Sequence, residues 1–72
     1  MIKVYGLANC NQCKGFCSIL KNRNIIYEYI ENESLITELG EKHSILSAPI
    51  VEIDSNFYNS RDAIAYINEH YN

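Results

Sequence analysis

The fold is decided by residues 2–13, which read IKVYGLANCNQC. The first four, Ile2-Lys3-Val4-Tyr5, alternate apolar and polar side chains and predict a strand that ends at Gly6. A short loop at 7–9 leads to Cys10, after which apolar residues follow helical spacing at Cys13, Phe16, Cys17 and Leu20. These residues therefore predict a strand, a loop and a helix, with two cysteines where the loop meets the helix.

The rest of the chain continues the alternation of strands and helices. We expect a strand at 25–30, a helix at 33–43, strands at 49–54 and 57–58, and a last helix capped by Ser60 or Asp62. Ser55-Asn56 is expected to turn between the last two strands, and Gly40 to mark a frayed helix end. The order βαβαββα predicts an α/β domain of two or three layers, whose first β-α-β unit is a right-handed parallel crossover.

Length, charge and hydropathy exclude several classes of protein. A chain of 72 residues allows one domain, which we expect to span 1–72. The net charge is −3 and the basic residues are scattered, so no basic stripe supports nucleic-acid binding. No apolar run is long enough for a membrane span, and the first five residues do not read as a signal peptide. We expect a cytoplasmic protein without nucleic-acid or membrane partners, and we expect a monomer.

Three cysteines, Cys10, Cys13 and Cys17, lie within eight residues. Crowded cysteines in a cytosolic protein indicate redox chemistry or a metal site, because secreted scaffolds spread an even number along the chain. Two residues between Cys10 and Cys13 allow a disulfide to close. A helix N-terminus stabilises a thiolate there, and Lys14 adds positive charge nearby. We predict that Cys10 attacks a substrate disulfide and that Cys13 resolves the mixed disulfide.

Cys17 has two interpretations. It lies on the apolar stripe of the predicted helix, which is typical of a buried core cysteine. Together with Cys10 and Cys13 it can instead form part of a copper, zinc or iron–sulfur site. A structural zinc site usually needs four ligands, and the candidates for the fourth are His43 and His70. A small metal-binding module is therefore the alternative to a redox protein.

The chain resembles the glutaredoxins, in particular the short glutaredoxin-like proteins of bacteria and phages that serve ribonucleotide reductase. The resemblance covers nearly the whole chain and rests on the first strand with Gly6, the Cys10-Asn11-Gln12-Cys13 motif, Ala48-Pro49, and Ser60-Arg61-Asp62. It implies a thioredoxin-like (glutaredoxin) fold, a four-stranded mixed sheet flanked by three helices. It also implies a thiol–disulfide oxidoreductase, with no tightly bound cofactor, that reduces protein disulfides or glutathione mixed disulfides.

The same resemblance assigns roles to individual residues. It implies that Pro49 is cis and packs beside the dithiol, and that the backbone of Ala48 pairs with the disulfide partner. It also implies that Gln12 and Asp62 contact glutathione, with Arg61 able to supply charge for the carboxylates. From the residues alone, Pro49 is equally acceptable as an ordinary proline at a strand start, and Asp62 as a helix cap.

Two positions depart from the family pattern. Leu7 is apolar where the family has a basic residue, and Tyr58-Asn59 replaces a Gly-Gly pair. Glycine lets a ligand approach the backbone closely, so the absence of the Gly-Gly pair weakens the expectation of tight glutathione binding. Gln12 between the cysteines resembles the short glutaredoxin-like donors, some of which are reduced by thioredoxin reductase; the resemblance thus implies that enzyme as the electron source, and glutathione is the other possibility.

Overall fold

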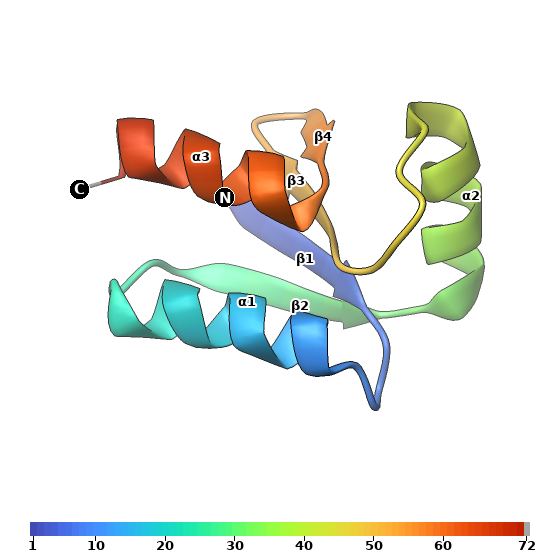
Figure 1. The fold of residues 1–72 in the computed structure, drawn as a ribbon, viewed down its shortest axis with the longest axis horizontal. Helices are drawn as coiled ribbons and strands as arrows, with labels where there is room; N and C mark the ends of the chain where they lie inside the picture. Colours follow the sequence, from blue (N-terminus) through green and yellow to red (C-terminus); the bar gives the residue numbers. More distant parts are fainter. Residues whose placement is uncertain (72) are drawn as a thin grey trace.

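The computed structural model describes residues 1–71, whose elements follow the order βαβαββα (Figure 1). The elements are β1 (Ile2–Gly6), α1 (Asn11–Asn22), β2 (Tyr27–Glu31), α2 (Glu33–His43), β3 (Ile50–Ile53), β4 (Asn56–Tyr58) and α3 (Ser60–His70). The predicted element order and fold class are confirmed, and the topology is thioredoxin-like.

The four strands form one mixed sheet in the order β2-β1-β3-β4. β1 and β2 run parallel, with Val4 opposite Tyr29, as a crossover through α1 requires. β3 runs antiparallel to both β1 and β4. β1 and β3 are thus the central strands, and their side chains alternate between two covered faces of the sheet.

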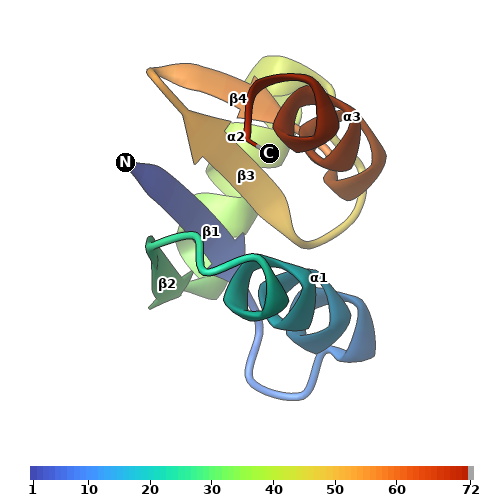
Figure 2. The same ribbon diagram turned by 90° about the vertical axis from the view of Figure 1, so that its left-hand side faces the viewer.

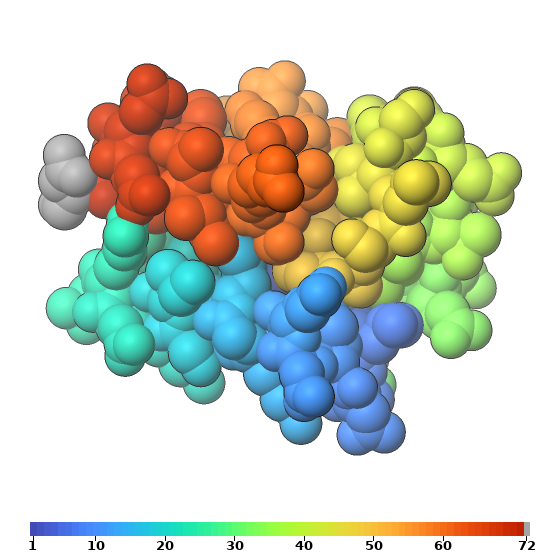
Figure 3. All heavy atoms as spheres, viewed as in Figure 1, coloured from blue at the N-terminus to red at the C-terminus, as the bar shows by residue number. Residues whose placement is uncertain are grey.

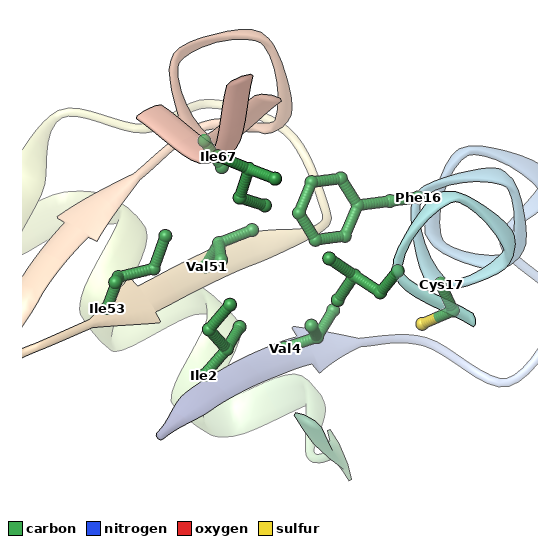
Figure 4. Packing of buried hydrophobic residues seen from close by; sticks show 9 residues of the cluster. Ile2, Val4, Phe16, Cys17, Val51, Ile53 and Ile67 are labelled. Carbon is green, nitrogen blue, oxygen red and sulfur yellow. The ribbon is translucent and has the colours of Figure 1, made fainter. Parts of the chain in front are cut away.

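Helices cover both faces, which makes the domain three-layered (Figure 2). On one face, α1 and α3 pack against the central strands around a cluster of buried apolar residues: Ile2, Val4, Phe16, Cys17, Leu20, Val51, Ile53, Ala63 and Ile67. Figure 4 shows Phe16 and Cys17 entering this cluster from α1 and Ile67 entering it from α3. Tyr5 and Ile50 alternate with these strand residues and lie on the other face, against which α2 packs.

β2 begins two residues later than predicted, because residues 24 and 25 close helix α1. Asn24 has a left-handed backbone with φ of 58°, and its N–H donates to the carbonyl of Lys21. The N–H of Ile25 donates to the carbonyl of Leu20 at 2.9 Å. This is the Schellman pattern, in which a left-handed residue satisfies the last carbonyls of a helix. Ile26 is left 80% exposed, outside the strand.

The turn between β3 and β4 lies one residue earlier than predicted. Ile53 pairs with Asn56, so the two turn residues are Asp54 and Ser55, with φ values of 50° and 69°. Two consecutive positive φ values are typical of the tight hairpin turn that matches the twist of the flanking strands. Because Asp54 belongs to this turn, the third strand ends at Ile53.

The sequence predicted that Gly40 marks a frayed helix end, and this prediction is wrong. The glycine is buried within α2, and its carbonyl accepts the N–H of Ile45 at 2.9 Å. A Cβ at this position would lie 2.6 Å from the carbonyl oxygen of Ile45. The missing side chain therefore lets the segment after α2 fold back closely against the helix.

Candidate redox site

Cys10 and Cys13 are joined by a disulfide at the start of α1. Their Cα atoms are 5.2 Å apart, within the usual range for a disulfide. Cys10 is the N-cap residue with extended backbone, and Cys13 lies in the first helical turn, as predicted. Cys10 is half-buried, whereas Cys13 is 0% exposed. Of the two sulfur atoms, that of Cys10 is therefore the one placed to meet another molecule.

The start of α1 favours negative charge on Cys10. Its Sγ accepts the backbone N–H of Cys13 at 3.1 Å, which is the hydrogen bond of an N-cap side chain. The first turn, residues 11–14, reads NQCK and thus carries no carboxylate that would oppose a thiolate. The unpaired N–H groups and the dipole of the helix both stabilise an anion at this point. After reduction, Cys10 has the surroundings of a reactive thiolate.

The peptide bond between Ala48 and Pro49 is cis, as the resemblance implied. Pro49 is buried, and Ala48 is partly exposed. Figure 3 shows the start of α1, the loop into β3 and the start of α3 together on one face of the molecule. The segments that carry Gln12, Pro49 and Asp62 therefore gather on the face that carries the redox motif.

A cavity of about 360 Å³ lies between α2, the segment after it and Leu7, the residue that follows β1. Its lining is mainly apolar and includes Leu7, Ile36, Ile45, Leu46 and Ala48. Leu46, one of these lining residues, is 99% exposed. The one ionisable side chain among its described lining residues is a carboxylate, that of Glu41.

The cap of α3 is Asn59, and the predicted caps Ser60 and Asp62 are wrong. The Asn59 side chain accepts the N–H of Asp62 at 2.8 Å. An asparagine in extended conformation reaches the third residue of the helix, so the helix begins one residue after it. Asp62 lies in the first turn, and both it and Arg61 are exposed. Gln12 is exposed in the first turn of α1.

Cys17 is a core residue, as the first interpretation predicted. It is buried in the cluster between α1 and the sheet and forms no disulfide. Burial raises the pKa of its thiol, and a hydrogen bond with Tyr27 acts in the opposite direction. A thiol with these surroundings is a poor nucleophile at neutral pH.

The arrangement does not support the metal-site alternative. Among residues 1–71, no group of three or more His, Cys, Asp or Glu side chains is placed to hold an ion. The ring of His43 stacks on that of Phe57 with centroids 4.2 Å apart. The ring centroids of His70 and Tyr66 are also 4.2 Å apart. Both histidines thus take part in aromatic packing.

Tyr29 is a neighbour of the site that the sequence did not indicate. Its hydroxyl donates to the carbonyl of Leu7 at 2.7 Å, in the loop that leads to Cys10. The contact joins residues 22 positions apart. The contact depends on the register of β1 and β2, in which Val4 lies opposite Tyr29.

No protein-family model matches the chain, and no curated protein matches it at a significant level. None of the helices described in residues 1–71 is long and apolar enough to cross a bilayer. The thioredoxin-like fold and the geometry around Cys10 and Cys13 together indicate thiol–disulfide redox activity.

Proposed function

We propose that this protein is a glutaredoxin-like thiol–disulfide oxidoreductase that reduces disulfides of other proteins in the cytoplasm. The observation that carries the proposal is the contact between Cys10 Sγ and the N–H of Cys13, 3.1 Å long, at the start of a helix. At this helix start, the half-buried sulfur of Cys10 has a hydrogen-bond donor beside it, and the buried sulfur of Cys13 lies within bonding reach. Attack by thiolate and subsequent resolution need these two properties.

The reaction transfers two electrons from the dithiol to the substrate. The Cys10 thiolate attacks one sulfur of the substrate disulfide, forming a mixed disulfide and releasing the other substrate sulfur as a thiolate, which takes a proton from solvent. Cys13 then loses its proton and attacks Cys10 Sγ. The Cys10–Cys13 disulfide forms, and the second substrate sulfur leaves as a thiolate and is protonated. An external reductant restores the dithiol.

The apolar cavity supports a protein as the disulfide partner. Its lining includes Leu7, the first residue of the loop to Cys10, and Ala48, next to Pro49. The one ionisable group among its described lining residues is the carboxylate of Glu41, so these residues offer no positive charge for the carboxylates of glutathione. We therefore favour a protein substrate, with ribonucleotide reductase as the one suggested by the resemblance, and thioredoxin reductase as electron source. Glutathione, held by Gln12 and Arg61, is the competing electron source.

Two single substitutions test the roles of the cysteines. Cys10→Ser should abolish reduction of both a protein disulfide and a glutathione mixed disulfide, because it removes the attacking thiolate. Cys13→Ser should abolish the first activity and retain part of the second, because a glutathione mixed disulfide can be reduced by one sulfur alone. Cys17→Ala serves as the control and should retain both activities. Equal losses in Cys10→Ser and Cys13→Ser in both assays would contradict the assigned roles.

A coupled assay distinguishes the two electron sources. The wild-type protein is assayed on a protein disulfide with NADPH and thioredoxin reductase, and separately with NADPH, glutathione and glutathione reductase. Turnover with the first system and little with the second is the expected result. The reverse outcome would show that glutathione is the donor.

A further inference from the structure

A tyrosine of the edge strand β2 reaches the loop that precedes Cys10. We call this loop, residues 7–9, the redox loop. The hydroxyl of Tyr29 donates a hydrogen bond to the backbone carbonyl of Leu7, the first residue of the redox loop, at 2.7 Å. Ala8 and Asn9 are exposed, so the redox loop has little packing of its own. The 2.7 Å length is at the most common value for an O–H···O hydrogen bond, and the bond connects the redox loop to the sheet.

Gly6 makes room for this contact. Val4 lies opposite Tyr29 in the parallel pair, and Gly6, two residues further on, faces the same side of the sheet. A Cβ on Gly6 would lie 2.7 and 2.8 Å from two ring carbons of Tyr29 and would also collide with its hydroxyl. Because such distances are too short for a real Cβ, the tyrosine ring occupies the place that a side chain at position 6 would take.

The other side of Tyr29 borders helix α1. Tyr29 lines a cavity of about 360 Å³ together with Lys14 and Cys17 of α1. The backbone N–H of Lys14 donates to the carbonyl of Cys10 at 3.0 Å. Tyr29 therefore lies beside the loop that precedes Cys10 and beside the first turns of the helix that follows it. A tyrosine hydroxyl is protonated at neutral pH, and partial burial raises the pKa of Tyr29 further, so its hydroxyl remains a donor.

We infer that Tyr29 is a positioning residue for Cys10, acting through the redox loop, with Gly6 as the residue that admits its ring. The inference rests on the proposed role of Cys10 as the attacking thiolate. In the disulfide form, Cys10 Sγ accepts the N–H of Cys13 at 3.1 Å, and this donor lies where it can stabilise the thiolate after reduction. Since Cys10 is the N-cap, its position is set by the loop before it as well as by the helix after it. Releasing the carbonyl of Leu7 loosens the loop and weakens this contact.

The test compares two conservative variants of the same strand. Tyr29→Phe keeps the ring and removes the hydroxyl that holds Leu7. Tyr27→Phe is the matched control, because its hydroxyl faces Cys17 instead of the redox loop. The fully reduced proteins are alkylated with iodoacetamide between pH 5 and 10, and the modified cysteine is identified by mass spectrometry. Tyr29→Phe should raise the apparent pKa of Cys10 and slow its alkylation at neutral pH about two- to tenfold, the range that one hydrogen bond spans.

Gly6→Ala provides a second route to the same contact. The new Cβ displaces the Tyr29 ring, so this variant should slow alkylation of Cys10 in the same direction. Combining it with Tyr29→Phe should add little, because both changes remove one contact. A Tyr29→Phe profile identical to wild type, or an equal change in Tyr27→Phe, would overturn the inference. Because alkylation needs no substrate, an inactive wild-type protein in the reductase assay would instead count against the proposed function.

Discussion

Two glycines in helices should respond in opposite directions to the same substitution. A Cβ on Gly15, in α1, meets nothing within 4 Å, whereas a Cβ on Gly40, in α2, lies 2.6 Å from the carbonyl oxygen of Ile45. Alanine stabilises a helix interior by about 1 kcal/mol relative to glycine. Gly15→Ala should therefore raise the free energy of unfolding by about 1 kcal/mol. Gly40→Ala gains the same propensity but must displace the backbone that follows α2.

The cost of Gly40→Ala follows from what the displaced backbone loses. The N–H of Ile45 donates to the carbonyl of Gly40 at 2.9 Å, and a bond of this kind contributes about 1 kcal/mol net. Forcing an extra carbon into a packed site costs about another 1–3 kcal/mol. With the helix propensity deducted, we expect a net loss of about 1–3 kcal/mol. In a domain of this size each 1 kcal/mol shifts Tm by about 4–8 °C.

The assay is urea unfolding of both variants and wild type, followed by circular dichroism. Equal m-values would show that the same surface is exposed in all three proteins, so that differences in midpoint report stability. Gly15→Ala should unfold at higher urea and Gly40→Ala at lower urea than wild type. If Gly40→Ala is as stable as Gly15→Ala, the close approach of Ile45 does not constrain this position and the reasoning is refuted.

Three further predictions concern the cap of α3, Tyr5 and Cys17. Asn59→Ala removes the acceptor of the Asp62 N–H and should lower the urea-unfolding free energy by about 1 kcal/mol; an unchanged midpoint would argue against the cap. Burial, and then the hydrogen bond to Glu52, raise the pKa of Tyr5 from 10.0 to about 12. The folded protein thus holds this proton more tightly than the unfolded chain, so its contribution to stability is complete below pH 10 and is lost as pH rises to about 12. Tyr5→Phe should accordingly show a shallower loss of stability over this range in alkaline unfolding, and an unchanged slope would contradict the assignment. Cys17→Ala should cost about 1 kcal/mol of stability and leave the reductase rate unchanged, whereas a loss of rate would give Cys17 a chemical role.

Local patterns predicted the elements well where one periodicity dominates. The helix at 33–43 has the observed bounds of α2, and the helical spacing from Cys13 to Leu20 marks the buried face of α1. The positions of Cys10 at the helix start and of Cys13 in its first turn followed from the motif and its flanks. These features depend on residues within one or two turns of each other, which is the range over which side-chain periodicity carries information.

Errors arose where one backbone torsion decides between neighbouring residues. Asn24 takes a left-handed conformation and shortens the second strand, and Asp54 does the same at the hairpin. Asn59 caps α3 although Ser60 and Asp62 are equally compatible with that role by residue type. In each case several adjacent polar residues suit the turn or cap, so residue type alone does not select one of them.

By itself the sequence determined the order of elements, the buried stripe of α1 and the dithiol at its N-terminus, because each is a matter of spacing along the chain. Tertiary structure alone decided which distant residues contact the loop that leads to that dithiol. Tyr29 meets the carbonyl of Leu7 because parallel pairing lays β2 beside β1, and Gly6 leaves space for its ring. Such contacts depend on strand register and on the volume left by a missing side chain, and neither is a property of any short stretch of sequence.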